Sequence, residues 1–230
     1  MSIGIQPITA VDGHTSFSVG ERAFHAITPI LFHTLPLSEE SKARITQARV
    51  ANFGKNPNTH GFKAVDTENG QLVGFALWIV YPEDDVLSLS VEEEARGKLG
   101  TEVPERRVEC SLAYYAMIAG GKREALGVEK DKKGEVVKLR KRVELGTLFV
   151  DPEYQRRGIA RQLLKFGFEE AERLGLEMTL EATREGKRLY ESLGFETVKV
   201  EQFDARPFGA DIVDDITFMV RPVGAKKGLQ

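Results

Sequence analysis

The chain has 230 residues, of which 41% are hydrophobic and 29% charged, and its formal net charge is −3. This length allows one large domain, and the small net charge excludes a global attraction to nucleic acid or to an anionic membrane. A lone cysteine, Cys110, excludes an intrachain disulfide framework and fits a reducing compartment. The longest apolar run, residues 72–81, is about half a membrane span. With no leader-like start to the chain, we expect a cytoplasmic protein, with the nucleus as the alternative.

The first third of the chain predicts a strand, two helices and a hairpin. Apolar and polar residues alternate near the N-terminus, which is typical of a half-buried strand. An Asn-Gly pair at 69–70 stands between two further alternating segments and predicts a tight turn between strands. The predicted elements are a strand at 3–8, helices at 20–35 and 38–53, and strands at 61–66 and 71–81.

Residues 82–142 have a mixed helical and basic character and are interpreted as an insert. A Ser-x-x-Glu capping box at Ser90 predicts a short helix. A longer helix is expected from Pro104, and Gly120-Gly121 is expected to bend or end it. Residues 122–142 hold nine Lys or Arg and four Asp or Glu. They are interpreted as a solvated loop or helix face, or as a basic rim near an anionic ligand.

The remaining chain predicts a strand–helix–strand unit followed by more strands. The helix carries an apolar stripe and stops at Gly175, a typical residue after a helix C-terminus. The strands on either side of it are expected to be parallel. The predicted elements are strands at 143–150 and 176–182, a helix at 184–193, and strands at 195–203 and 215–220, with a disordered tail at 222–230.

The turn Gln155-Arg156-Arg157-Gly158 lies where the first of these strands gives way to the helix. A helix N-terminus has unpaired N–H groups and a positive dipole end, so it can hold a pyrophosphate. Gly158 lets a ligand approach the backbone closely because it has no Cβ. Arg161 and Lys165 add positive charge. The pattern is neither a P-loop nor a complete dinucleotide-binding glycine motif.

Two short motifs connect this turn to a known family. Gln155-Arg156-Arg157-Gly158-Ile159-Ala160 fits the signature Gln/Arg-x-x-Gly-x-Gly/Ala, and Tyr190-x-x-x-Gly194-Phe195 follows the next strand. In this order they resemble the GNAT superfamily of acyl-CoA-dependent N-acetyltransferases, and the chain is similar to small GNAT-domain proteins of fungal type. The resemblance implies an α/β (α+β) fold with a mixed central sheet of six to seven strands flanked by helices. It also implies a single domain at 1–221, a helical insert at 82–142 between the third and fourth strands, and an acyl-CoA-binding core at 143–203.

The same resemblance implies acetyl-CoA as cosubstrate, without a metal, and an amine acceptor. The N–H of Leu148 would polarise the acetyl carbonyl, as the donor of an oxyanion hole does. The positions implied to bind the cosubstrate are Leu148, Phe149, Val150, Gln155, Arg156, Arg157, Gly158, Ile159, Ala160 and Arg161.

Two side chains are expected to move protons. Tyr190 is the candidate general acid for the leaving thiolate, because a phenol has a pKa near 10. Glu144 is the candidate general base, and Glu181, acting directly or through water, is the alternative. The leading hypothesis is acetyl transfer to a primary amine of a small molecule. The alternatives are a protein lysine or N-terminus as acceptor, or a non-catalytic acyl-CoA sensor. The sequence leaves open the acceptor, the acyl chain preference and the oligomeric state.

Overall fold

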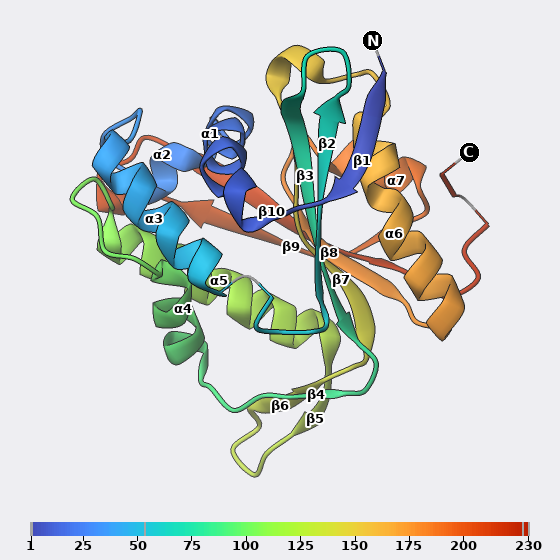
Figure 1. The fold of residues 1–230 in the computed structure, drawn as a ribbon. Helices are drawn as coiled ribbons and strands as arrows, with labels where there is room; N and C mark the ends of the chain where they lie inside the picture. The colour runs from blue at the N-terminus through green and yellow to red at the C-terminus, as the bar shows by residue number, and fades with distance from the viewer. Residues whose placement is uncertain (1, 53, 227, 230) are drawn as a thin grey trace.

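One large sheet lies between two groups of helices in the computed structural model, which describes residues 2–52, 54–226 and 228–229 (Figure 1). The large sheet is built from β1 Ile3–Pro7, β2 Thr59–Asp66, β3 Gln71–Tyr81, β7 Arg142–Val150, β8 Met178–Ala182, β9 Glu196–Asp204 and β10 Val213–Arg221. A small sheet holds β4 Asp85–Val86, β5 Gly127–Lys130 and β6 Val136–Leu139. The helices are α1 Gly13–Ala23, α2 Thr28–Leu31, α3 Glu39–Asn52, α4 Val91–Leu99, α5 Val108–Leu126, α6 Ile159–Leu174 and α7 Lys187–Ser192.

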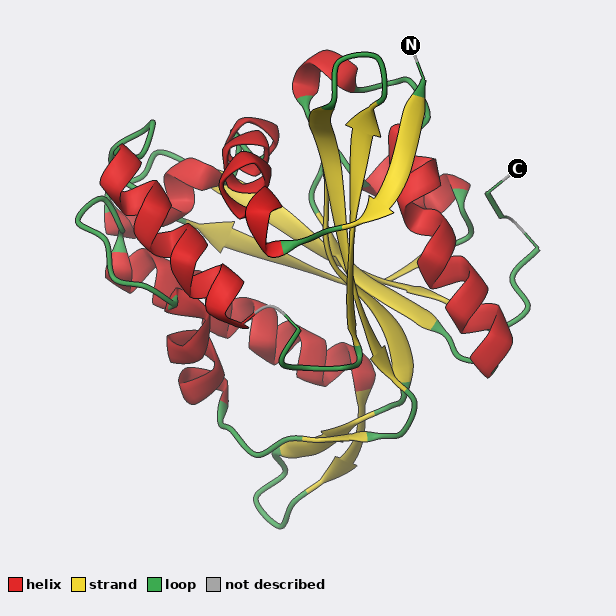
Figure 2. Cartoon of the chain, viewed as in Figure 1, coloured by secondary structure: helices red, strands yellow, loops and turns green. Residues whose placement is uncertain are grey.

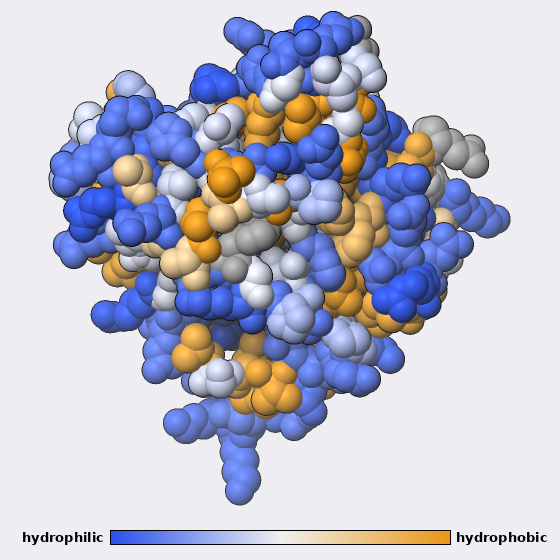
Figure 3. All heavy atoms as spheres, viewed as in Figure 1, coloured by the Kyte–Doolittle hydropathy of each residue, from blue (hydrophilic) through white to orange (hydrophobic). Residues whose placement is uncertain are grey.

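The strands of the large sheet run in the order β1-β2-β3-β7-β8-β10-β9. Neighbouring strands are antiparallel except β7 and β8, which are parallel and joined through α6. Helices α6 and α7 cover one face, and α1, α2, α3 and α5 lie on the other (Figure 2). Hydrophilic residues cover most of the face seen in Figure 3. The mixed seven-stranded sheet flanked by helices confirms the predicted fold class.

Helix α6 packs on the sheet through a close contact between a glycine and a tryptophan. The side chain of Trp78 on β3 is fully buried, and its indole Nε1–H donates to the carbonyl of Leu163 at 3.4 Å. A Cβ at Gly167 would lie 2.4 Å from the Trp78 ring. The absent side chain at Gly167 therefore lets the helix approach the sheet closely enough to bury the indole. The helix ends as predicted, at Gly175 in a left-handed conformation.

The insert between β3 and β7 contains α4, α5 and the small sheet. The capping box at Ser90 is confirmed, with Ser90 and Glu93 exchanging hydrogen bonds at the start of α4. Gly120-Gly121 does not end the longer helix, because α5 continues through both residues to Leu126, and a bend there stays a prediction. A Cβ at Gly121 would lie 2.4 Å from the ring of Phe218 on β10. Gly121 therefore allows α5 to pack closely on the sheet, and it does not end the helix.

Residues 122–142 fit their interpretation as a solvated segment only in part, since residues 127–135 are exposed but both ends of the segment are buried. Lys122 and Arg123 are buried at the end of α5, and β5 and β6 form a hairpin. Arg123 donates to Glu94 of α4 at 2.7 Å and to the Leu89 carbonyl at 2.9 Å. These contacts tie the two insert helices together. Lys122 and Arg123, the first two basic residues of this segment, therefore belong to the interior.

The N-terminal helices begin and end differently from the prediction for 20–35. Helix α1 starts earlier, at Gly13, and a separate short helix α2 has Pro29 in its first turn. Proline lacks an N–H, so it cannot continue α1 but suits the start of a new helix. The helix predicted at 38–53 is confirmed as α3, with residue 53 outside the described residues. Of the tail at 222–230, residues 227 and 230 lie outside the described part, and the Ala225 carbonyl accepts a hydrogen bond from Arg221 at 2.9 Å.

Candidate active site

Strands β7 and β8 pair along only part of their lengths and then separate. Their parallel pairing covers Val143–Leu145 with Met178–Leu180, although β7 continues to Val150 and β8 to Ala182. On its other edge, β7 pairs with β3, and the register shifts so that Gly146 has no partner. From Gly146 onward no described strand pairs with the β8-facing edge of β7. We call this opening, formed by 146–150 and 181–182, the fork.

The backbone N–H of Leu148 faces the fork. The N–H of Asp151, just past the end of β7, donates to the Val73 carbonyl of β3 at 2.8 Å. Because successive N–H groups of a strand point to alternate edges, the N–H groups of Leu148 and Val150 point away from β3. Leu148 is half-buried, and its N–H is free to bind a ligand that enters the fork.

The turn between β7 and α6 exposes several backbone amides. Arg156 has φ +63° and Gly158 has φ +80°, and Gly158 is the N-cap of α6. Within the described chain, the N–H groups of Gly158, Ile159 and Ala160 have no hydrogen-bond acceptor. A Cβ at Gly158 would meet no atom within 4 Å. Successive amides in such a conformation form a concave anion site, strengthened by the helix dipole.

An ion pair between a buried aspartate and a half-exposed arginine holds the start of this turn in place. Asp151 is 2% exposed and pairs with Arg22 of α1. The other carboxylate oxygen of Asp151 accepts from the N–H of Glu153 at 3.2 Å. Gln155 is anchored as well, because its side-chain amide donates to the Val150 carbonyl at 3.2 Å. The turn is therefore tied to both α1 and β7.

The side chains of the predicted binding residues point in different directions. Phe149 is buried against the rings of Phe24 and Phe75, and Ile159 is 1% exposed. These two positions can meet a ligand only through their backbone. Arg157 lies over the Tyr154 ring and donates to the Glu153 carbonyl.

Two further cations lie beside the open amides. Arg156 is exposed, and Arg161 reaches Ser192 of α7, to which it donates at 3.0 Å. Ala160 is half-buried in the first turn of α6. The structure thus brings the amides and these cations to one end of α6.

Tyr190 lies on α7 and is buried. Its ring meets Phe195 edge-on at 5.7 Å, and a Cβ at Gly186 would lie 3.1 Å from it. In the described part of the chain no hydrogen bond holds its hydroxyl. Burial raises the pKa of Tyr190 above its usual value near 10. The phenol therefore carries its proton at neutral pH.

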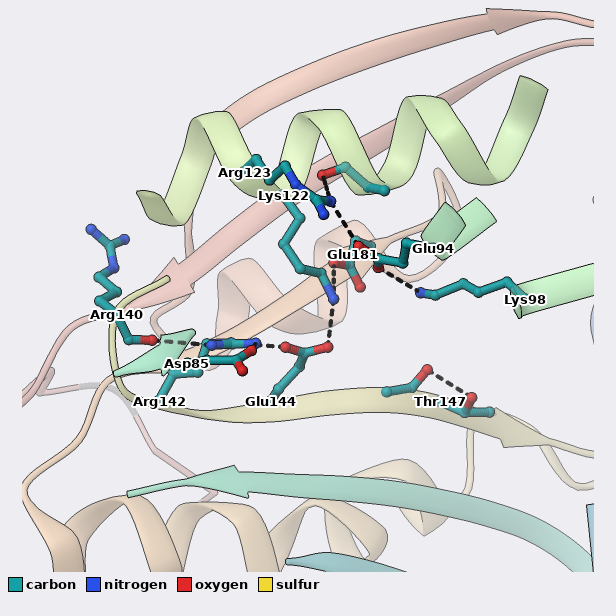
Figure 4. Close-up of polar contacts among 12 residues, drawn as sticks. Asp85, Glu94, Lys98, Lys122, Arg123, Arg140, Arg142, Glu144, Thr147 and Glu181 are labelled. Carbon is teal, nitrogen blue, oxygen red and sulfur yellow. Dashed lines mark hydrogen bonds and ion pairs between the residues drawn. The ribbon is translucent and has the colours of Figure 1, made fainter. Parts of the chain in front are cut away.

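Glu144 is not the free carboxylate that a sequence pattern suggests. It is 4% exposed, accepts from Lys122 Nζ at 2.5 Å and from Arg142 Nε at 2.8 Å, and so lies between two cations (Figure 4). Burial alone would raise its pKa, but Lys122 and Arg142 lower it to about 2. A carboxylate with this pKa is a weak base.

Glu181 faces the same lysine from the neighbouring strand. Its carboxylate lies 3.1 Å from Lys122 Nζ, and its side chain is 19% exposed, against 6% for Glu144. It follows Leu180, the last residue of β8 that pairs with β7, so it stands at the base of the fork. The structure thus joins Glu144 and Glu181 in one cluster.

Sequence reasoning missed Lys122 and Arg142. Arg142 is 1% exposed, lies 3.8 Å from the centre of the Tyr81 ring and pairs with Asp85 at 3.3 Å. Both belong to a segment dense in lysine and arginine, where composition alone indicates solvent. One signal in the sequence could have indicated the burial of Lys122. The apolar periodicity of the helix continues up to this residue, which places it on a helix that packs against the interior.

Two features are absent from the described residues. No group of three or more His, Cys, Asp or Glu side chains is arranged to hold a metal ion. None of the described helices combines the length and the apolar character needed to cross a bilayer.

The comparisons with known proteins agree with this geometry. The family described as acetyltransferase (GNAT) domain matches residues 105–206. That range holds α5, the fork, the turn and α6. The chain carries a GNAT acetyltransferase domain. The predicted family and the acyltransferase class of its domain are thereby confirmed.

Individual relatives share the fold of this GNAT domain more than its sequence. The chain is 42% identical to the uncharacterized N-acetyltransferase YafP of Escherichia coli (strain K12), over 59 residues that make up 26% of this chain and 37% of that protein. Arylalkylamine N-acetyltransferase 2 from Aedes aegypti has a TM-score of 0.63 at 18% identity, with 97% of this chain and 100% of that chain covered. A histone acetyltransferase HPA2 and related acetyltransferase structure from Corynebacterium glutamicum has a TM-score of 0.55 at 19% identity, with 97% and 98% covered. The narrower likeness to fungal proteins stays a prediction.

Proposed function

We propose that this protein is an N-acetyltransferase that moves the acetyl group of acetyl-CoA to a primary amine of a small molecule. One observation carries the proposal. The amides without a described partner at the start of α6 directly follow the strand β7, whose edge toward β8 is unpaired from Gly146 onward. A coenzyme with a diphosphate and an extended amide-bearing arm needs both features. The amides would bind the diphosphate, and the strand edge would hydrogen-bond the arm as an added strand does.

The predicted roles of the binding residues fit this arrangement. The backbone of 155–160 would hold the diphosphate, with Arg156 and Arg161 neutralising its charge. The Leu148 N–H, which points into the fork, would donate to the carbonyl oxygen of the thioester as negative charge develops there. These residues act mainly through backbone groups, so the site depends on chain conformation more than on side-chain identity.

The acceptor amine must lose a proton, because an alkylammonium has a pKa near 10. Of the two carboxylates at the fork, Glu181 is the more exposed and has one cationic partner, whereas Glu144 is enclosed by two. Glu181, directly or through water, is therefore the better proton acceptor. Tyr190, which keeps its proton at neutral pH, would protonate the departing thiolate.

The insert favours a small acceptor over a protein. Helix α5 packs along β9 and β10 and sends Lys122 to the base of the fork. A peptide strand would need this face open, whereas a small amine does not. A protein lysine or N-terminus as acceptor, and a sensor that binds acyl-CoA without turnover, are the alternatives that the following experiments separate.

Calorimetric titration of the protein with acetyl-CoA and with CoA tests the coenzyme site. Gly158→Glu places a carboxylate beside the amides and should weaken binding by about 100-fold or more, because charge-assisted hydrogen bonds worth about 1.5–3 kcal/mol each are lost. The matched control is Gly134→Glu in the β5–β6 turn. Gly134 has φ +84°, and a Cβ there also meets nothing within 4 Å. Both substitutions carry the same backbone strain, so equal affinities in the two variants would refute the site.

Turnover is tested with acetyl-CoA, a thiol reagent and four acceptors: phenethylamine, spermidine, glucosamine and a lysine-containing peptide. We expect thiol release with at least one small amine and faster than with the peptide. Release with the peptide alone would identify a protein acetyltransferase. Coenzyme binding without release on any acceptor would identify a sensor.

A further inference from the structure

Lys122 lies at the centre of the charged cluster and comes from the insert. Its Nζ is 2.5 Å from Glu144 of β7 and 3.1 Å from Glu181 of β8, and its side chain is 10% exposed. Figure 4 shows the lysine side chain extending from α5 to these two carboxylates. One ammonium therefore bridges the two strands at the place where they begin to separate.

The charges around the cluster explain why this ammonium matters. Arg142 binds Glu144 and Asp85 but makes no described contact with Glu181. Removing the Lys122 charge would leave Glu181 with no cationic partner among the described residues and beside the buried Glu144 carboxylate. Like charges at this separation favour uptake of a proton by one of the two. The other titratable and charged groups that face Lys122, Glu144 and Glu181 are Tyr81 on β3, Asp85 on β4, Tyr114 on α5 and Arg142 on β7.

We propose that Lys122 is a positioning residue for acetyl transfer: it holds the Glu144 and Glu181 carboxylates side by side at the base of the fork, so that Glu181 is fixed where it can take up the amine proton. The inference rests on the proposed function. In the reaction, the amine nitrogen forms a bond to the acetyl carbon and the carbon–sulfur bond breaks. The alkylammonium first gives one proton to solvent through Glu181. After attack, the nitrogen gives its second proton to Glu181, the thiolate takes a proton from Tyr190, and Tyr190 is reprotonated from solvent. Lys122 touches none of the reacting atoms and acts through the carboxylates.

Burial and charge agree with this role. Burial alone would lower the pKa of Lys122, but Glu144 and Glu181 raise it above its usual value. The lysine therefore remains charged and is a poor nucleophile, which argues against Lys122 itself as an acetyl acceptor. It is also held firmly, since both of its contacts lie on strands of the central sheet.

The experiment is a titration of the carboxylates without any ligand, by NMR of protein labelled with ¹³C at the glutamate side-chain carboxyl. Glu144→Gln and Glu181→Gln assign the two resonances. Lys122→Met should raise the pH at which the Glu144–Glu181 pair takes up its first proton by about one unit or more, a tenfold change in proton affinity. Lys122→Arg should restore the wild-type midpoint. An unchanged midpoint in Lys122→Met would overturn the inference.

A second variant covers the case in which Lys122→Met does not fold. Lys122→Met combined with Glu144→Gln removes one charge of each sign, so it should fold and titrate close to wild type. A large rise of the midpoint in this double variant also contradicts the inference.

With the best acceptor of the panel, the acid limb of the pH profile for kcat/KM should move with the NMR midpoint, while the Kd for CoA stays unchanged. If wild type neither binds CoA nor releases thiol, the proposed function fails, but the ligand-free titration still decides the charge role of Lys122.

Discussion

Acid should destabilise this protein through Glu144 in particular. The folded-state pKa of Glu144 is about 2, against 4.5 for an unperturbed glutamate. A pKa that is lower in the folded state stabilises the fold above pH 4.5, and this contribution is lost as the pH falls toward 2. A difference of about 2.5 pH units, at about 1.4 kcal/mol each, corresponds to about 3–4 kcal/mol. We therefore expect the free energy of unfolding to fall by about this amount from Glu144 alone.

The assay is urea unfolding of wild type and Glu144→Gln at a series of pH values from 7 to 2. At pH 7 the variant should be less stable by about 3–5 kcal/mol, because Lys122 and Arg142 lose their shared buried partner. Between pH 4.5 and pH 2 the two stabilities should converge, because the unfolded wild-type chain takes up a proton at Glu144 in this range and the folded protein does not.

Glu169→Gln is the matched control, because Glu169 pairs with Lys165 on the exposed surface of α6, where an ion pair contributes less than about 1 kcal/mol. Parallel stability curves for wild type and Glu144→Gln between pH 5 and pH 2 would refute the reasoning.

Two further substitutions test the acid and the packing of α6. Tyr190→Phe should lower turnover by about 100-fold in the thiol-release assay, and an unchanged rate would reject the acid role. The free energy of unfolding in urea should stay within about 0.5 kcal/mol of wild type, because no described hydrogen bond to the hydroxyl is lost. Gly167→Ala should lower stability by about 1–3 kcal/mol, because its Cβ would lie 2.4 Å from the buried Trp78 ring, and a melting temperature equal to wild type would contradict this packing.

The half of the site that we propose for the coenzyme is local in sequence, so its backbone structure could be predicted. A strand, a turn with Gly158 and a helix follow one another within about 30 residues, and each has its own signal in the chain. The left-handed conformation of Gly158 and the end of α6 at Gly175 follow from the same local rules. The position of Leu148 depends only on its distance from the turn.

The acceptor half could not be predicted in the same way, because it joins segments far apart in the chain. Glu144 looks like a strand-end carboxylate in sequence, and only the fold brings Lys122 and Arg142 to it. Burial of Tyr190 likewise depends on Phe195 and on the sheet beneath α7. Within the basic segment, only the apolar periodicity before Lys122 distinguishes this buried cation from its exposed neighbours.

The absence of a helix end at Gly120-Gly121 and the missed role of Lys122 have one physical cause. A glycine pair late in a helical pattern usually favours an end, because glycine is a poor helix former. In this chain Gly121 instead lies against the Phe218 ring, where any side chain would hold α5 away from β10. Lys122 is the next residue, and only a helix this close to the sheet lets its ammonium reach carboxylates on both β7 and β8. The feature that misled the sequence interpretation is therefore the one that completes the charge arrangement at the fork.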